Sequence, residues 1–138
     1  MLIGLSPLLG PDLLHALRAM GHGDEIALVD GNYPAADHAR RLIRADGVTL
    51  LPLLQAVLQV LPVEQVMRSA LNNDPTQAGP VHNQIDGIVA QAGQTAVALA
   101  GDALYPRVRS AYAVIATSEP ALYANVILRK AALPPASP

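Results

Sequence analysis

A histidine between two glycines, followed by an aspartate at the end of an apolar run, forms the most chemically suggestive pair in this sequence. His22 lies in the segment Met20-Gly21-His22-Gly23-Asp24, and Asp30 follows residues 26–29. A histidine side chain can both accept and donate a proton at neutral pH. The flanking glycines leave room for a ligand beside the imidazole. The pair therefore indicates general acid–base chemistry, with Asp30 orienting a substrate hydroxyl or the imidazole.

Each of these residues also has a simpler interpretation. His22 follows a predicted helix and, as a basic residue, would suit the unpaired carbonyls of its last turn. Asp30 enters the Gly-Asn-Tyr-Pro loop of residues 31–34, where an aspartate often accepts bonds from its own loop. Both alternatives stay open at the level of sequence.

A third candidate, the triplet Tyr123-Ala124-Asn125, lies far along the chain, after the turn Ser118-Glu119-Pro120. The asparagine amide both donates and accepts hydrogen bonds, and the tyrosine adds a hydroxyl and an apolar ring face. Such a set suits a polyol, whose hydroxyls need paired donors and acceptors. Ordinary turn chemistry is the alternative.

The elements that must position these residues alternate between short strands and helices. The hydrophobic pattern predicts strands over 25–29, 41–45, 63–71, 95–100, 112–117 and 125–129. It predicts helices over 11–20, 50–60, 81–92 and 104–110, with Pro106 confining the last helix to beginning there. We therefore expect one α/β domain of three layers over residues 1–138, with a mostly parallel or mixed sheet covered by helices and a proline-rich tail over 131–138. Ligands gather at the carboxyl ends of strands in such sheets, so we expect His22 and Asp30 near the same end.

Composition excludes several classes of function. The chain of 138 residues has a net charge of −2, no Phe or Trp and no basic cluster, which disfavours nucleic-acid binding. Its longest apolar stretch, 48–61, is too short to span a membrane, and the N-terminus lacks a basic signal region, so a cytoplasmic protein is expected. No histidine pair has zinc-site spacing, and nucleotide motifs are absent, so no metal is expected. Only 14% of residues are charged, against ~25% in a typical protein, which predicts burial between subunits.

Several motifs in register resemble the L-fucose mutarotase and D-ribose pyranase family, in its fucose branch. They are the segment 20–26 with His22, the segment 43–47 (Ile-Arg-Ala-Asp-Gly) and the segment 123–128 that opens with Tyr-Ala-Asn. The resemblance covers nearly the whole chain in the same order and is weakest from 72 to 102. It implies an isomerase that interconverts the anomers of a free monosaccharide without a cofactor.

The same resemblance assigns roles to individual residues. It makes His22 the acid/base group, and it makes Asp30, Tyr123, Ala124 and Asn125 the sugar-binding residues. It also implies a ring-shaped homo-oligomer, often a decamer, with sites at subunit contacts.

One position departs from the family pattern. A basic residue that touches the sugar in the family corresponds here to Gly101, so either Arg107 or Arg109 of the following helix supplies the charge or the contact is absent. This departure favours a rival function, a sugar-binding or regulatory subunit without turnover. A purely structural oligomer, in which the His22 turn is only a helix cap, is a third alternative.

Overall fold

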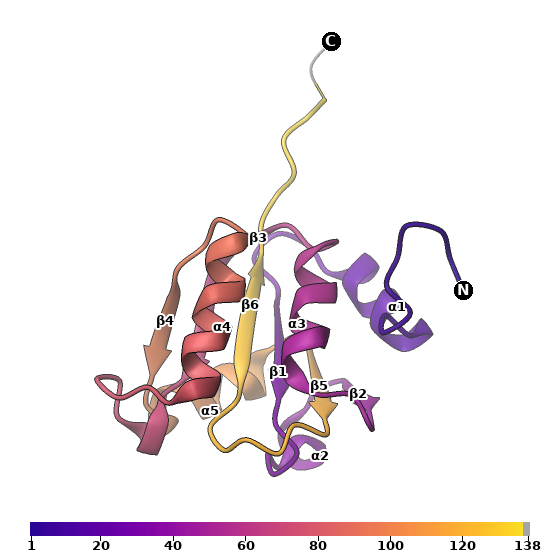
Figure 1. Cartoon of the computed structure of the whole chain (residues 1–138). Coiled ribbons are helices and arrows are strands. Elements are labelled where there is room, and N and C mark those ends of the chain that lie inside the picture. The colour runs from indigo at the N-terminus through magenta and orange to yellow at the C-terminus, as the bar shows by residue number, and fades with distance from the viewer. Residues whose placement is uncertain (137–138) are drawn as a thin grey trace.

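The sequence folds into an α/β sandwich in which helices cover both faces of one sheet (Figure 1). The computed structural model describes residues 1–136. The strands are β1 (Glu25–Val29), β2 (Leu42–Ala45), β3 (Val63–Ser69), β4 (Ala96–Leu99), β5 (Ala113–Thr117) and β6 (Val126–Lys130). The helices are α1 (Pro11–Ala19), α2 (Ala35–His38), α3 (Leu50–Leu58), the 3-10 helix η1 (Leu71–Asn73), α4 (Pro80–Gln91) and α5 (Gly101–Ser110). The predicted three-layer α/β fold with a mixed sheet is confirmed.

The direction of the last strand decides which chain segments meet. The strand order is β2-β5-β1-β6-β3-β4, and β6 runs antiparallel to both of its neighbours, β1 and β3. The end of β1, the end of β3 and the start of β6 therefore lie together, at an edge that we call the Asp30 edge (Asp30, Ser69 and Asn125). The start of β1, the start of β3 and the end of β6 meet at the opposite edge, the His22 edge (near His22, Glu64 and Arg129).

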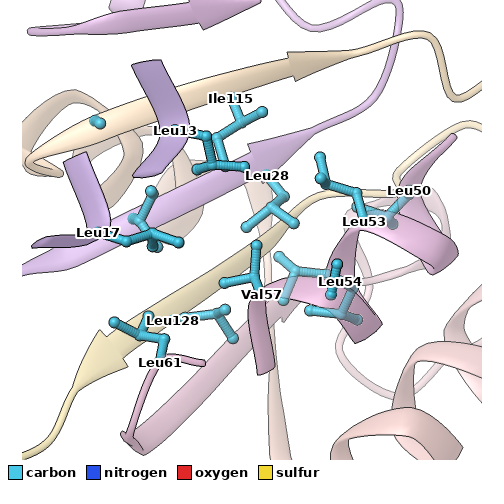
Figure 2. Close-up of a cluster of buried hydrophobic side chains, with 14 of the residues drawn as sticks. Leu13, Leu17, Leu28, Leu50, Leu53, Leu54, Val57, Leu61, Ile115 and Leu128 are labelled. Atoms are coloured by element: carbon cyan, nitrogen blue, oxygen red, sulfur yellow. The ribbon is translucent and has the colours of Figure 1, made fainter. Parts of the chain in front are cut away.

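Alternating strand residues build two hydrophobic cores, one on each face of the sheet. In β1, Ile26 and Leu28 face α1, α3 and α4, whereas Ala27 and Val29 face α2 and α5. Figure 2 shows Leu28 among side chains of α1 and α3. A fully buried leucine or isoleucine contributes about 1.5–3 kcal/mol relative to an exposed one. Both cores therefore hold β1, and with it the residues at its two ends.

The prediction that the last helix begins at Pro106 is wrong, because α5 begins at Gly101 and carries Pro106 inside. Proline lacks an N–H and removes one bond of the helix. Burial of Leu104 and Val108 against the sheet offsets that loss and keeps the helix continuous across it.

Beyond β6, residues 131–136 form neither helix nor strand and lead away from the sheet (Figure 1). The rest of the expected tail, residues 137–138, lies outside the described residues. Among residues 1–136, none of the helices has the length and hydrophobicity that a membrane crossing requires.

Candidate functional site

The expectation that His22 and Asp30 lie near the same end of the sheet is wrong. His22 precedes β1 and Asp30 follows it, so the whole strand separates them. β1 has five residues, and an extended strand of that length holds its two ends roughly 17 Å apart. The candidate residues therefore divide into two groups on opposite edges of the sheet.

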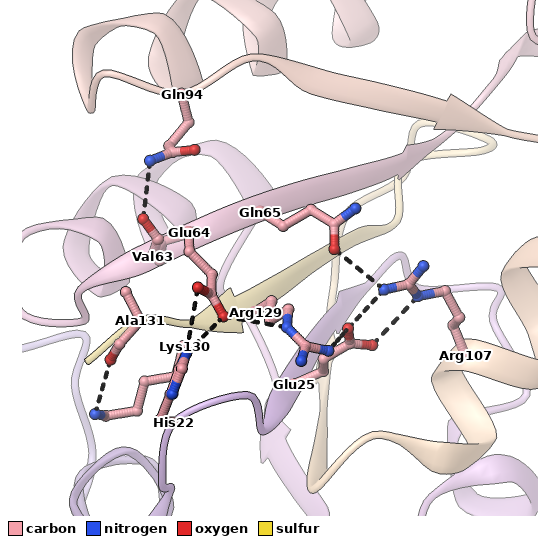
Figure 3. Close-up of polar contacts among 10 residues, drawn as sticks. All are labelled: His22, Glu25, Val63, Glu64, Gln65, Gln94, Arg107, Arg129, Lys130 and Ala131. Atoms are coloured by element: carbon pink, nitrogen blue, oxygen red, sulfur yellow. Dashed lines mark hydrogen bonds and ion pairs between the residues drawn. The ribbon is translucent and has the colours of Figure 1, made fainter.

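At the His22 edge, the imidazole of His22 is paired with a carboxylate. Its Nε2 lies 3.1 Å from Oε1 and 3.3 Å from Oε2 of Glu64 (Figure 3). A carboxylate only accepts, so neutral His22 carries its proton on Nε2 and presents the lone pair of Nδ1. The His22 side chain is 60% exposed, which leaves the ring accessible from outside. These bonds go to Glu64 rather than to a helix carbonyl, which speaks against the helix-cap interpretation.

Arginines surround this pair. Arg129 donates from Nε to Oε1 of Glu64 at 3.2 Å. The bond from His22, and then that from Arg129, lower the pKa of the Glu64 carboxyl, which stays ionised beside the imidazole. Arg107 donates two hydrogen bonds to the carboxylate of Glu25, from Nε at 3.3 Å and from Nη2 at 2.7 Å (Figure 3). Arg107, an expected substitute for the family's basic residue at the Gly101 position, therefore lies at the His22 edge.

The glycines beside His22 have backbone roles. Gly23 has φ +88°, and a Cβ there would lie 3.1 Å from Nη2 of Arg129. The N–H of Gly21 donates to Oδ2 of Asp24 at 2.7 Å. A cavity of about 340 Å³ opens beside this turn, with charged lining residues Asp24, Glu25, Arg40, Arg107 and Arg129.

At the Asp30 edge, the residue Asp30 is 6% exposed, and its carboxylate joins two distant parts of the chain. Its Oδ1 accepts the N–H of Asn32 at 3.0 Å, as expected of a turn residue, and its Oδ2 accepts the N–H of Ala124 at 3.1 Å. Burial raises the pKa of Asp30, and bonds from the backbone N–H groups of Ala124, Asn32 and Tyr33 oppose that rise. Each oxygen keeps a lone pair with which a ligand hydroxyl could bond.

Asn125 ties the same edge together. Its Oδ1 accepts the N–H of Asp30 at 2.9 Å, and its Nδ2 donates to Oγ of Ser69 at 3.0 Å. The buried Ala124 and the half-buried Tyr123, which has φ +56°, precede it. The structure therefore brings together Asp30 and the triplet that the sequence singled out from opposite ends of the chain.

A cavity of about 360 Å³ adjoins Asp30 and is also lined by Tyr33, Arg44 and Thr117. The hydroxyl of Tyr33 lies 2.8 Å from Nδ1 of His38. Burial raises the pKa of this phenol. Sequence reasoning missed Tyr33 as a candidate because it lies in a Gly-Asn-Tyr-Pro loop that resembles an ordinary turn. Within residues 1–136, no group of three His, Cys, Asp or Glu side chains is placed to hold a metal ion.

The place beside Gly101 is filled by Asn73. A Cβ at Gly101 would lie 2.9 Å from Oδ1 of Asn73, which is closer than real contacts allow, and Asn73 itself has φ +59°. Gly101 begins α5 at the Asp30 edge, so an amide side chain packs where the family pattern has a basic residue.

We expect Gly101→Ala to raise the free energy of unfolding less than Gly87→Ala does. Gly87 lies exposed in α4 with open space around its Cβ position, so alanine there should stabilise the protein by about 0.5–1 kcal/mol. Alanine at 101 must first displace the Asn73 side chain. Chemical denaturation at one protein concentration measures both, and equal gains would contradict the contact with Asn73.

Three polar residues of these edges escaped sequence reasoning: Glu64, Ser69 and Arg129. Glu64 and Ser69 lie in β3 and Arg129 lies in β6, and the hydrophobic pattern of these two segments predicts strands but no site residue. Their pairing with His22 and Asn125 depends on the strand order, which local patterns do not reveal.

The fold and its two polar edges define a small α/β protein with buried hydrogen-bonding side chains at one edge of its sheet and an exposed histidine at the other. The model of the RbsD / FucU transport protein family matches residues 3–133. The chain therefore belongs to this family, and the resemblance drawn from its motifs is confirmed.

Named relatives and solved structures agree with this membership. The fucose mutarotase of Bos taurus is 41% identical over 144 residues, covering 96% of this chain and 94% of the relative. The crystal structure of the fucose mutarotase of Streptococcus pneumoniae in complex with L-fucose matches with a TM-score of 0.85 at 34% identity, covering 96% of this chain and 99% of that one. The structure of protein Atu2016, a putative sugar binding protein, matches with a TM-score of 0.90 at 33% identity, covering 97% of both chains.

Proposed function

We propose that this protein is a monosaccharide mutarotase that interconverts the anomers of L-fucose or a related free sugar. The observation that carries the proposal is the exposed His22–Glu64 pair, which presents an unprotonated imidazole nitrogen to the outside. The polar cluster of Asp30, Tyr123, Ala124 and Asn125 supplies hydrogen-bonding groups of the kind that sugar hydroxyls need. The relatives named fucose mutarotase support the same substrate class.

Anomer exchange needs a proton to leave one oxygen and reach another. Nδ1 of His22 takes the proton of the anomeric O1–H, the bond from C1 to the ring oxygen breaks, and the resulting imidazolium delivers that proton to the ring oxygen. The open aldehyde turns about its C1–C2 bond and closes on the other face as the steps reverse. Glu64 accepts the Nε2–H bond throughout and stabilises the imidazolium while it carries the extra proton. No electrons or groups are transferred, so no cofactor is required.

A single chain does not bring His22 to the residues proposed to bind sugar, because β1 separates the two edges. We therefore place the complete site at a contact between two copies, where the His22 edge of one chain meets the Asp30 edge of its neighbour. Such a head-to-tail contact repeats around a closed ring. This matches the ring-shaped oligomer, often a decamer, that the family resemblance implies.

Surface chemistry supports such a contact. Leu122 is 61% exposed directly beside Tyr123, and only 14% of residues are charged. A cytoplasmic location, as expected from the sequence, fits an enzyme acting on free monosaccharides.

Saturation-transfer NMR with L-fucose, D-ribose and related sugars tests the proposal. We expect the protein to transfer saturation between the α and β signals of L-fucose or a close relative, well above the rate in buffer alone. The general acid–base contribution to that rate should be about 10²–10⁴-fold.

The other two functions are distinct outcomes of the same experiment. Binding of a sugar without faster exchange would favour the binding or regulatory subunit, for which Gly101 is the motivating feature. Failure to bind any sugar of the panel would favour a structural oligomer.

A further inference from the structure

A fully buried histidine lies behind the sugar-binding triplet and has no role in the proton transfer described above. His82, in the first turn of α4, is 1% exposed. Its Nδ1 accepts the N–H of Gly79 at 2.9 Å, so the proton of the neutral ring is on Nε2. That Nε2–H donates to the backbone oxygen of Tyr123 at 2.9 Å.

The peptide between Tyr123 and Ala124 is therefore held at both ends. His82 binds its carbonyl oxygen, and Oδ2 of Asp30 accepts its N–H at 3.1 Å. Two side chains from distant elements thus fix the plane of one peptide group at the Asp30 edge.

This peptide needs such support, because Tyr123 has φ +56°. A residue with a large side chain rarely adopts the left-handed region, and holding it there costs of the order of 1 kcal/mol. If the carbonyl were released, the peptide could rotate toward an ordinary conformation, turning the Tyr123 side chain and moving the Ala124 N–H away from Asp30. Asp30 would then lose one of the two bonds that set its carboxylate.

We infer that His82 is a positioning residue of the sugar site: its Nε2–H holds the Tyr123 peptide in the conformation that aims Tyr123 and Asp30 at the sugar. The inference rests on the proposed sugar-binding role of this edge for its functional consequence. The contact itself stands on geometry alone and can be tested without a sugar.

Two conservative variants separate the two bonds of His82. An asparagine amide oxygen reaches the place of Nδ1, so His82→Asn can keep the bond to Gly79 while losing the donor to Tyr123. A glutamine amide nitrogen reaches the place of Nε2, so His82→Gln can keep the donor to Tyr123. His15→Asn, the same change on an exposed histidine of α1, is the matched control.

The first readout is the oligomer's own sugar kinetics, measured by saturation transfer at several sugar concentrations. We expect His82→Asn to raise KM about ten-fold, with a smaller change in kcat, because a lost hydrogen bond weakens the placement of the sugar rather than the proton transfer. His82→Gln should return KM to within about three-fold of the unaltered protein, and His15→Asn should leave it unchanged. Equal KM values for His82→Asn and His82→Gln would overturn the inference.

The second readout is hydrogen exchange of the intact protein, followed by mass spectrometry and without sugar. His82→Asn should accelerate exchange in the peptide that contains Ala124 and leave the start of α4 near Gly79 protected. Unchanged protection at Ala124 would overturn the inference even if no sugar of the panel binds. If the asparagine variant fails to fold, the glutamine variant decides the matter: slow exchange at Ala124 supports the inference, and fast exchange there overturns it.

Discussion

We expect the His22→Ala protein to lose anomer exchange almost completely while it keeps its fold and its affinity for sugar. The imidazole is the proposed acceptor and donor of the transferred proton, and general acid–base groups contribute about 10²–10⁴-fold to a rate. The side chain is 60% exposed and bonds only through Nε2 to Glu64 among the described residues. Its removal therefore leaves no buried group unpaired. Saturation transfer measures the exchange rate, and thermal unfolding at one protein concentration measures the stability.

His15→Ala is the matched control for this variant. His15 is an exposed histidine of α1, and its loss should leave exchange unchanged. An exchange rate in His22→Ala equal to that of the unaltered protein would remove His22 from the mechanism. A large loss of stability would instead mean that His22 supports the turn before β1.

The second large effect is the rescue of activity when two inactive variants share one oligomer. His22→Ala removes the proposed acid–base group from the His22 edge of a chain, and Asp30→Asn removes the proposed sugar-binding carboxylate from its Asp30 edge. We propose that each site joins the His22 edge of one chain to the Asp30 edge of the next. A site is then intact wherever an Asp30→Asn chain contributes its His22 edge and a His22→Ala chain contributes its Asp30 edge. In an equal, random mixture about one quarter of the ring contacts have that order, so about one quarter of the original activity should return.

Co-expression with two different tags, followed by purification on both, yields the mixed oligomer. Two tagged copies of His22→Ala, purified in the same way, should remain inactive. Because Asp30 is buried, Tyr123→Phe serves as a second partner that leaves all backbone contacts of the Asp30 edge in place. A doubly tagged oligomer that stays inactive with both partners would show that contacts between copies do not assemble the site in this way.

His22 and Asp30 show which features of the site can be predicted from the sequence and which cannot. The turn, the strand and the loop around them were all predicted within a residue or two, because glycines, prolines and the apolar run of 26–29 act locally. Their expected closeness was wrong, because a strand of five residues places its flanks at opposite edges of the sheet. The two ends of one strand are close in sequence and remote in space.

Asn125 and His82 show the reverse case. Asn125 is far from Asp30 along the chain, yet its side-chain oxygen lies 2.9 Å from the backbone nitrogen of Asp30. His82 is far from Tyr123, yet its Nε2 lies 2.9 Å from the backbone oxygen of Tyr123. The antiparallel insertion of β6 between β1 and β3 creates the first contact, and the packing of α4 against the sheet creates the second. No spacing in the sequence encodes either contact.

The sequence by itself determined most of the longer elements, the family and the residue types that could transfer a proton or bind a sugar. These follow from periodicity, turn chemistry and motifs, each of which is read within a few residues. Only the tertiary structure decided that His22 pairs with Glu64, that Arg107 is bound to Glu25, and that the proposed acid–base and sugar-binding groups occupy opposite edges. The physical reason is that strand order and direction are set by the burial of both faces of the sheet, which depends on the whole chain at once.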